Sequence, residues 1–402
     1  MRMQPVDLPL VRGGPPRSDL LICFSHLRWH FVYQRPQHLL SRAAAAWRVW
    51  FFEEPVFEDM DMPGRLRIEP QPCGVVVIVP VLKHGSTIAE QTATQRDLLD
   101  CLLSSHHHSR LMGWYYTPMA LKFSDHLEFS VCVYDCMDEL SAFNFAPPEL
   151  TMLEQTLMQR AQLMFTGGHS LYEAKRQHHQ NCHAFPSAVD CAHFGCARNH
   201  SAEPADQASI PRPRVGFFGV IDERMDMSIV SELARLRPDL HFVLIGPVVK
   251  IDPASLPRAA NLHWLGPKDY SVLPQYLCGW NAAFMPFAMN EATRFISPTK
   301  TPEFLAAGVP VCSAPVHDVI NPYGTKGLVQ IAATASEFSD KLDLVLAGAD
   351  DVWLERVDRF LAHVSWDETW ERMRTLIESA AGETDSESAL LATTPRAAQS
   401  HV

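Results

Sequence analysis

The stretch that decides the fold is "FISPTKTPEFLAAGVPVCSAPV", residues 295–316. Lys300 and Glu303 stand where a short helix should begin, because Pro302 fits a first helical turn and Thr301 can cap it. The helix can also begin one turn earlier. A glycine ends it and an apolar strand follows, so the stretch is typical of the helix-to-strand unit of an α/β protein.

The polar residues at this helix start suggest a ligand. A helix N-terminus points backbone amides outward, which favours an anion, and Lys300 beside Thr299 adds a positive charge. The Glu303 carboxylate would repel a phosphate directly against it, but it can accept hydrogen bonds from a diol such as a ribose. A nucleoside diphosphate carries both groups. The alternative is that Glu303 only complements the helix dipole and Lys300 balances it.

The rest of the chain alternates apolar runs with helical runs. Predicted strands cover 19–26, 48–55, 75–80, 110–118, 130–138, 163–168, 182–189, 214–220, 241–247, 262–266, 282–287, 309–315 and 328–332. Predicted helices between them cover 34–47, 86–104, 148–161, 170–179 and 227–236. Because the apolar runs are continuous rather than alternating, they favour parallel strands covered on both faces. The fold class is therefore α/β, with two Rossmann-like, doubly wound domains facing a cleft.

The domain boundaries follow from where the alternation breaks. We expect a flexible leader (1–18), an N-terminal acceptor domain (19–196), a linker (197–213), a C-terminal donor domain (214–364), a C-terminal helix that packs back on the N-terminal domain (365–381) and a disordered tail (382–402). The linker is polar and carries three prolines.

Composition limits the possible functions. The chain has 402 residues, 47% of them apolar and 20% charged, with a formal charge of −12. Such a chain is globular, and its acidic balance argues against nucleic acid as a partner. No apolar run approaches the ~18 residues of a spanning helix, and the leader lacks the apolar run of a secretion signal, so we expect a cytoplasmic protein with reduced cysteines.

A second segment of the C-terminal domain points to the same ligand. Gly219 ends the strand 214–220 and would let a phosphate approach the backbone. Arg224 follows and could hold a diphosphate with its planar guanidinium, although a tight turn with a solvated arginine is the alternative. Because ligands of doubly wound sheets lie beyond the carboxyl ends of the strands, this segment and the helix at Lys300 should meet.

Taken together, these motifs resemble a known enzyme family. "RVGFFGVIDERMD", "HFVLIGP" and "NEATRFISPTKTPEFLAAGVPV" are similar to the GT-B glycosyltransferases of group 1, the retaining type that uses nucleotide sugars. "YDCMDEL" and "LMFTGGHSLYEAKRQHH" in the first half match more loosely. "FSHLRWHFVYQRPQHLLSR" is similar to a bacterial subgroup associated with surface polysaccharide synthesis. The resemblance covers roughly residues 19–380.

The resemblance implies a donor site in the second domain. Glu303 would bind the ribose, Arg224 and Lys300 would hold the diphosphate and stabilise the leaving group, and "LGPKDY" would lie near the base. It implies no metal and no cofactor beyond the nucleotide-diphosphate sugar that serves as donor substrate.

One departure from the family pattern concerns the donor sugar. The family often has a second glutamate eight positions before the first, where this chain has Phe295. Asn290 and Glu291 are the nearest residues that could contact the sugar. The resemblance therefore predicts the fold more firmly than it predicts retention of the anomeric configuration.

The acceptor side should come from the first domain. After the strand 19–26, Trp29 and Phe31 could pack on a sugar face, and Arg28 or Arg35 could hold an acceptor phosphate. The alternative is a packed loop with ordinary surface arginines.

Two residues at strand ends are candidates for acid–base chemistry. Asp138 follows the strand that begins at 130 and is the preferred base. His26 comes next, because its charge can change near neutral pH, although a lone histidine at a strand end is more often structural.

The sequence therefore predicts an enzyme that moves a sugar from a nucleotide donor to a carbohydrate or lipid-linked acceptor, with peripheral contact at the inner face of a membrane. A nucleotide-sugar epimerase of the same fold, or a binding module with weak turnover, are the alternatives. A dinucleotide oxidoreductase is disfavoured because no G-x-G-x-x-G follows either leading strand. A zinc site in the segment 182–196 is disfavoured because its cysteines lack C-x-x-C spacing.

Overall fold

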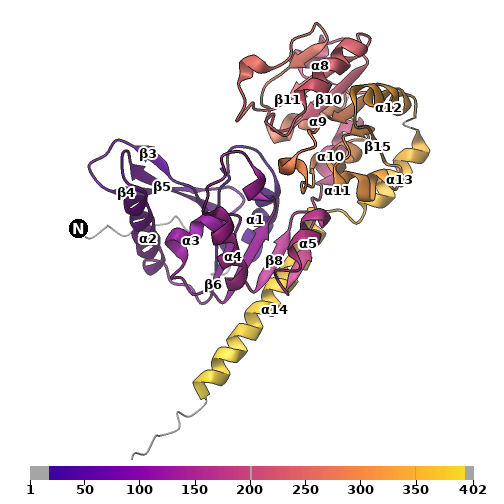
Figure 1. The fold of residues 1–402 in the computed structure, drawn as a ribbon. Helices are drawn as coiled ribbons and strands as arrows, with labels where there is room; N and C mark the ends of the chain where they lie inside the picture. Colours follow the sequence, from indigo (N-terminus) through magenta and orange to yellow (C-terminus); the bar gives the residue numbers. More distant parts are fainter. Residues whose placement is uncertain (1–17, 200–201, 349, 394–402) are drawn as a thin grey trace, which may run out of the picture.

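The protein forms two α/β domains joined by a short crossing segment and a returning helix (Figure 1). The computed structural model describes residues 18–199, 202–348 and 350–393. Most of the predicted leader and the last part of the predicted tail lie outside these residues. Both domains contain a predominantly parallel sheet with helices on its faces, so the predicted fold class is confirmed.

The N-terminal domain is built on a sheet with the strand order β3-β5-β2-β1-β6-β7-β8-β9. Its strands are β1 (Leu20–Ser25), β2 (Arg48–Glu53), β3 (Val56–Glu58), β4 (Gly64–Pro70), β5 (Val75–Lys83), β6 (Leu111–Tyr115), β7 (Val131–Cys136), β8 (Leu163–Thr166) and β9 (Cys182–Ala184). The central strand β1 is fully buried, as its continuous apolar sequence predicts.

Helices cover this sheet. They are α1 (Arg35–Ala46), α2 (Ile88–Ser104), η1 (Pro118–Ala120), α3 (Leu121–Ser124), η2 (Leu140–Ala142), α4 (Leu150–Arg160) and α5 (His169–Lys175). The next two elements, α6 (Cys191–Gly195) and η3 (Cys196–Asn199), pack against the C-terminal domain instead. The start of α2 shows why a helix forms there. Thr87 Oγ1 accepts a hydrogen bond from the Glu90 amide, and the Glu90 carboxylate accepts one from the Thr87 amide, which makes a capping box.

Two strands escaped the sequence prediction. β3 pairs with β5 in parallel, and β4 runs antiparallel to β5 at the edge of the sheet. The sequence of β4, "GRLRIEP", alternates polar and apolar residues, which is typical of a strand with one solvated face. A search for continuous apolar runs misses such a strand.

The C-terminal domain has a parallel sheet with the strand order β12-β11-β10-β13-β14-β15. Its strands are β10 (Arg214–Phe218), β11 (His241–Ile245), β12 (Leu262–Trp264), β13 (Ala282–Met285), β14 (Val311–Ser313) and β15 (Val329–Ile331). This is the 3-2-1-4-5-6 order of a Rossmann-like sheet. The strand order reverses between β10 and β13, so a ligand crevice is expected beyond their carboxyl ends.

The helices of this domain position that crevice. They are α7 (Ala205–Ala208), α8 (Met227–Leu236), η4 (Pro253–Ser255), η5 (Tyr270–Val272), α9 (Leu273–Leu277), η6 (Glu291–Thr293), α10 (Lys300–Ala306), α11 (His317–Val319), η7 (Ile320–Gly324), α12 (Ala335–Gly348) and α13 (Asp351–Leu361). Asp226 caps α8 by accepting hydrogen bonds from the amides of Ser228 and Ile229. α10 follows β13, and its first turn therefore lies at the switch point.

The helix α14 (Trp366–Thr393) returns to the N-terminal domain and contacts α1, β7 and β8 (Figure 1). Trp366 stacks on His38 with ring centroids 4.7 Å apart, and Trp370 meets Trp47 edge-on at 5.5 Å. α14 extends past residue 381 to Thr393, so the first part of the predicted disordered tail is helical instead.

The predicted linker packs on the C-terminal domain in its described part. In its described part, the side chain of Gln207 is fully buried, donates to the Tyr276 carbonyl at 2.8 Å and accepts from Trp280 Nε1 at 2.8 Å. The segment therefore packs on the C-terminal domain, because its polar residues find partners there. Among the described helices, none has the length and apolar character that crossing a membrane requires.

The attachment of α14 can be tested by a core truncation. Met373 is fully buried against the N-terminal domain, so Met373→Ala should lower the free energy of unfolding of that domain by about 2–5 kcal/mol. Urea denaturation followed by tryptophan fluorescence measures this. Glu371→Ala, at an exposed position on the same helix, serves as the control, and equal stability of the two variants would contradict the packing.

Candidate functional site

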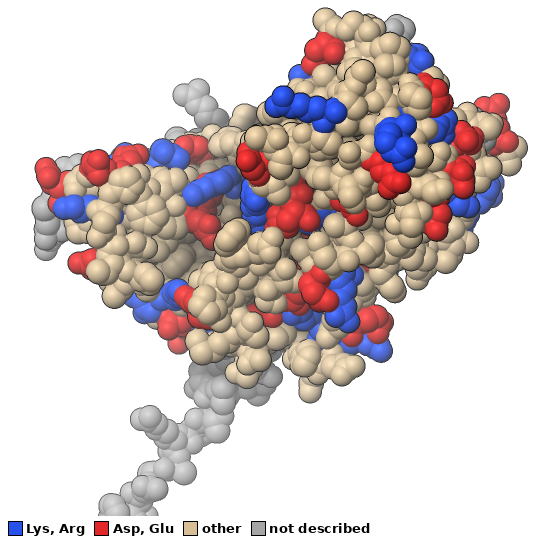
Figure 2. All heavy atoms as spheres, turned by 45° about the horizontal axis from the view of Figure 1, so that its top comes forward, with Lys and Arg blue, Asp and Glu red and all other residues tan. Residues whose placement is uncertain are grey.

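A cavity of about 430 Å³ lies between the two domains. The loop after β1 forms one wall, and the ends of β10 and β11 with the start of α10 form the other. Its lining includes Tyr33, Gly219, Gly246, Tyr270, Lys300 and Glu303. In the space-filling view, the surface between the two lobes is hollowed and both basic and acidic side chains gather there (Figure 2). The structure thus brings Gly219, Lys300 and Glu303 together.

Glu303 is a buried, only partly compensated acid on the wall of this cavity. The residue is 4% exposed, and its Oε2 atom has no hydrogen-bond partner among the described residues. The Lys300 ammonium lies 3.7 Å from the same oxygen. Burial raises the pKa of Glu303 to about 7, against the opposing effect of Lys300. A buried acceptor without a partner is costly, so the site favours a ligand that donates hydrogen bonds to it.

Lys300 extends from the first residue of α10 toward Gly219. Its Nζ donates to Thr299 Oγ1 at 2.9 Å and lies 5.4 Å from the centre of the Phe218 ring. Gly219 has a φ of +149°, and a Cβ atom at that position would lie 3.2 Å from Lys300 Cε. A side chain there would strain the backbone and press on the lysine, so the turn after β10 favours glycine.

A second glycine at the cavity was missed by the sequence prediction. Gly246 follows β11 with a φ of +149°, and a Cβ atom there would lie 1.7 Å from the Gly219 carbonyl oxygen. The two turns therefore touch, and neither leaves room for a side chain. The glycine at the end of "HFVLIG" was the available signal.

Tyr270 is a further residue of the cavity that sequence reasoning did not single out, although it ends the motif "LGPKDY". Its ring stacks between His193 (centroids 4.3 Å apart) and Tyr33 of the N-terminal domain (4.5 Å). Its hydroxyl is buried without a hydrogen-bond partner. Burial, with the nearby Glu303 charge, raises the pKa of Tyr270, which therefore stays a donor. The cavity thus contains one unpartnered donor and one unpartnered acceptor.

A smaller cavity of about 150 Å³ shares Tyr33, Gly219 and Lys300 with the first. Asp138 and Arg224, from opposite domains, also line it. Three of the predicted catalytic side chains, Lys300, Arg224 and Asp138, therefore line two cavities that share residues.

Arg224 is held in place by its own loop. Its Nε donates to Asp222 Oδ1 at 3.0 Å and its Nη2 to Asp222 Oδ2 at 2.7 Å, a bidentate pair with a buried carboxylate. Its guanidinium carbon lies 5.6 Å from the centre of the Phe143 ring of the N-terminal domain. The Nη1 group has no hydrogen-bond partner among the described residues and can bind an anion.

Asp138 can exchange a proton near neutral pH. Burial raises its pKa to about 6, while the charges of Arg224 and Arg35 act in the opposite direction. A carboxyl group with such a pKa can hold or accept a proton at the working pH of most enzymes.

His26 does not behave as expected. Burial lowers its pKa to about 4, the backbone of Tyr116 acts in the opposite direction, and the charge of Lys250 lowers it further. The expectation that its charge changes near neutral pH is therefore wrong. Its ring lines neither of the two cavities, and Nδ1 is buried without a partner.

The predicted acceptor arginines are bound within the N-terminal domain. Arg35 is 3% exposed and donates to both carboxylate oxygens of Asp135, at 2.8 and 3.0 Å, and to the Phe185 carbonyl at 2.7 Å. Arg28 donates to Glu53 at 2.9 Å and to the Pro55 carbonyl at 3.1 Å. Protein groups thus occupy several donors of each arginine, and Arg35 also lines the smaller cavity. Their assignment to an acceptor phosphate stays a prediction.

The predicted aromatic residues divide between core and cavity. Trp29 is 9% exposed and meets Phe51 edge-on at 5.1 Å, so most of it packs in the core, although it also lines the larger cavity. Phe31 is 46% exposed and lines the larger cavity, on the donor side rather than at a separate acceptor site.

Asn290 and Glu291 do not reach either cavity. The Asn290 side chain caps η6 by accepting from the Thr293 amide at 3.1 Å. Glu291 is exposed and pairs with Arg294 at 3.4 Å. Phe295, at the position of the second family glutamate, packs against the core of the N-terminal domain. Their assignment to the donor sugar is therefore not supported.

The segment 182–196 was weighed as a metal site. His193 stacks on Tyr270, and His183 contacts Asn181 Oδ1 at 2.7 Å. In the part of the chain that the structure describes, no group of three or more His, Cys, Asp or Glu side chains is placed to hold a metal ion.

Sequence comparison finds a glycosyltransferase relative. No protein-family model matches the chain. TuaH of Bacillus subtilis strain 168, named provisionally as a teichuronic acid biosynthesis glycosyltransferase, is 26% identical over 235 residues. The alignment covers 53% of this chain and only 58% of TuaH.

Solved structures match nearly the whole chain. A trehalose-6-phosphate structure from E. coli, bound with UDP-2-fluoro glucose, is 12% identical, with a TM-score of 0.64 over 89% of this chain and 98% of that one. Anabaena Alr3699/HepE, in complex with UDP and glucose, is 13% identical, with a TM-score of 0.59 over 90% of this chain and 100% of that one. The resemblance predicted from the sequence is confirmed: the chain has the GT-B fold of these solved structures, and over about half its length it is similar in sequence to a glycosyltransferase.

Proposed function

We propose that this protein transfers a sugar from a nucleoside diphosphate sugar to a carbohydrate acceptor. The observation that carries the proposal is the buried, unpartnered carboxylate of Glu303, which shares a cavity with Lys300 and Gly219. A ribose diol would satisfy the carboxylate. The diphosphate would then extend along the Gly219 backbone toward Lys300 and the free edge of Arg224.

Tyr270 fits the same ligand. Its unpartnered hydroxyl can donate to a ribose or base oxygen while Glu303 accepts from the ribose. Pro267, Lys268 and Asp269 line the same cavity and form the wall for the base.

The same arrangement supports the chemical step. As the bond between the sugar and the diphosphate breaks, negative charge develops on the leaving diphosphate, and Lys300 with Arg224 would stabilise it without a metal ion. Asp138 borders the neighbouring cavity and would accept the proton of the attacking hydroxyl. Retention of configuration is the outcome that the family resemblance implies.

The name of the relative TuaH favours transfer over epimerisation and over binding alone, whereas the fold is common to all three. Because TuaH is named for teichuronic acid biosynthesis, we propose an acceptor in surface polysaccharide assembly. A lipid-linked acceptor, with peripheral contact at the inner face of a membrane, stays a prediction.

Nucleotide binding should depend on Glu303. Glu303→Ala removes a charge-assisted acceptor and should weaken binding of a nucleoside diphosphate by about 1–3 kcal/mol, or about 5- to 150-fold. Isothermal titration with uridine, guanosine and adenosine diphosphates measures this and identifies the base. Glu291→Ala, at an exposed position outside both cavities, is the control. Equal affinities in the two variants would remove Glu303 from the site.

Turnover should depend on the two cations. Lys300→Ala and Arg224→Ala should each lower kcat by about 100-fold or more, because each removes charge stabilisation of the leaving diphosphate. Arg235→Ala, at an exposed position on α8, should keep the wild-type rate. Normal kcat in both Lys300→Ala and Arg224→Ala would mean that the diphosphate binds elsewhere.

Donor affinity should rise with pH. The Glu303 carboxyl has a pKa of about 7 in the free protein, above its ordinary value of 4.5, so it is mostly protonated at pH 6 and mostly ionised at pH 8. The ionised form accepts hydrogen bonds from ribose, so a nucleotide sugar should bind about tenfold more tightly at pH 8 than at pH 6.

The Glu303→Gln variant separates the contribution of Glu303 from that of Asp138, because glutamine does not titrate whereas Asp138 still does in the variant. The pH dependence of donor binding, measured by titration calorimetry, should be flatter in Glu303→Gln than in the wild type. The same pH dependence in both proteins would show that another group controls it.

A further inference from the structure

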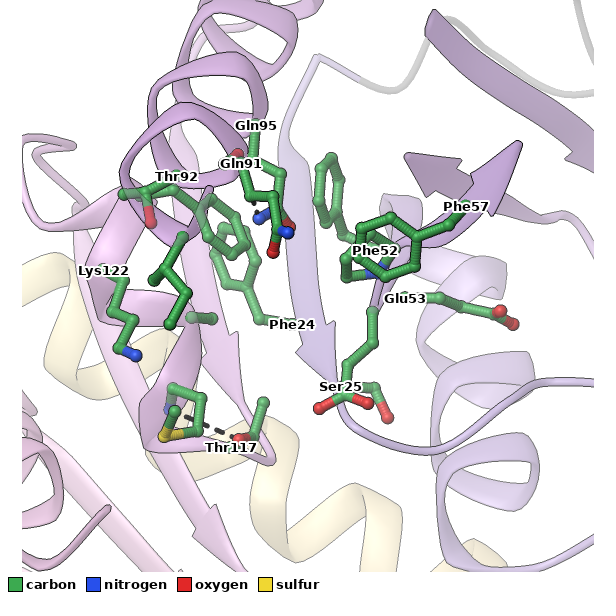
Figure 3. Close-up of a pocket in the computed structure, with 16 residues that line it drawn as sticks. Phe24, Ser25, Phe52, Glu53, Phe57, Gln91, Thr92, Gln95, Thr117 and Lys122 are labelled. Atoms are coloured by element: carbon green, nitrogen blue, oxygen red, sulfur yellow. Dashed lines mark hydrogen bonds between the residues drawn. The ribbon is translucent and has the colours of Figure 1, made fainter. Parts of the chain in front are cut away.

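A third cavity, of about 300 Å³, lies in the N-terminal domain and shares no lining residue with the other two (Figure 3). It lies beyond the carboxyl ends of β1 and β2, beside α2 and η1. Phe24, Phe52 and Phe123 form a buried aromatic floor, with ring centroids 5.6 to 5.8 Å apart. Its size is at the lower end of the range for small-molecule sites.

Uncharged polar groups face each other across this floor. Gln91, Thr92 and Gln95 come from α2 on one side, and Ser25 and Thr117 lie at the opposite end (Figure 3). The Gln95 side chain is 8% exposed and donates to the Gln91 carbonyl at 3.3 Å. Its side-chain oxygen has no partner among the described residues, so it is left to accept a hydrogen bond from a ligand.

The charges around the cavity oppose an anionic ligand. The Lys122 ammonium is paired with the Glu149 carboxylate, so no lining residue, all of which the structure describes, offers an unpaired cation. The Glu54 carboxylate has no hydrogen-bond or ion-pair partner among the described residues. The Arg28 charge favours the ionised Glu54 carboxylate, but its guanidinium is already bonded to Glu53 and to the carbonyls of Glu54 and Pro55. A phosphate or carboxylate on the ligand would therefore meet a net negative charge.

Aromatic faces combined with convergent amide, hydroxyl and carboxylate groups suit a sugar ring. The ring's C–H face can pack on the phenylalanines while its hydroxyls bond to the polar groups. A lipid chain would pack well on the phenylalanine floor. It would, however, bury the polar groups of Gln95, Ser25 and Thr117 without hydrogen bonds to the ligand, which costs free energy.

We propose that this cavity binds an uncharged sugar residue of the acceptor carbohydrate, as a subsite remote from the reacting hydroxyl. The proposal rests on the proposed glycosyltransferase function and names its acceptor class. Hydrogen bonds connect a lining residue of the subsite with a lining residue of the donor cavity. The Glu53 carboxylate accepts from the Trp29 amide at 2.8 Å and from Arg28 at 2.9 Å, and Trp29 lines the donor cavity.

The test compares two neighbouring positions on α2. Thr92→Trp would fill the cavity, whereas Ala93→Trp places the same side chain at an exposed position that does not line it. Saturation-transfer NMR on the full chain, with methyl N-acetylglucosaminide as probe, measures binding. The expected result is binding to the wild type and to Ala93→Trp, and at least a tenfold loss in Thr92→Trp. The 6-phosphate of the same sugar should bind at least tenfold more weakly than the neutral probe.

Three results would overturn the proposal: no binding of the neutral sugar to the wild type, equal affinity in Thr92→Trp and Ala93→Trp, or tighter binding of the 6-phosphate. Displacement of the bound sugar by 1-octanol at low concentration would point to a lipid chain and would also contradict it. Nucleoside diphosphate binding is measured in the same three proteins. If the wild type does not bind a nucleoside diphosphate, the proposed function is contradicted. If the wild type binds the nucleoside diphosphate but not the neutral sugar, only the proposed subsite is contradicted.

Discussion

The interdomain cavity is built around one constraint, the burial of the Glu303 carboxylate at its edge with the Lys300 ammonium nearby. The first turn of α10 places the carboxylate there, and the 3.7 Å contact with Lys300 compensates only part of its desolvation. A stable core would not retain such a group without a partner, because an unsatisfied buried acceptor costs free energy. The two glycine turns at Gly219 and Gly246 keep the space in front of it open.

Contacts between the domains hold the two walls of this cavity together. Tyr33 stacks on Tyr270 across the cavity, and the Asp318 carboxylate accepts from the Ser170 amide at the start of α5, at 3.0 Å. The chain also runs from the C-terminal domain back to the N-terminal core through α14, which packs there. The cavity therefore depends on how the domains pack as well as on the sheet that carries α10. Ligand binding and domain closure should therefore be coupled, as they are in enzymes that close on their substrates.

The sequence predicted the fold and the meeting of Gly219, Lys300 and Glu303 in one cavity, but it did not predict which protein groups the other candidate residues contact. Continuous apolar runs marked the parallel strands, and the rule that ligands lie at strand ends placed Gly219 beside the start of α10. The pairing of Arg35 with Asp135 could not be read in the same way, because the two residues lie 100 positions apart and meet only through tertiary packing. The Tyr33–Tyr270 stack and the cavity beside α2 also arise through tertiary packing of residues that lie far apart in the sequence. The pKa of His26 was missed because burial at a strand end leaves no pattern in the sequence.

The structure of the protein in complex with a nucleoside diphosphate tests the central claim most directly. We expect both ribose hydroxyls to lie within hydrogen-bond distance of the Glu303 carboxylate, with the phosphates between the Gly219 backbone, Lys300 and Arg224. A nucleotide bound away from this cavity, with the Glu303 carboxylate still unpartnered, would contradict it.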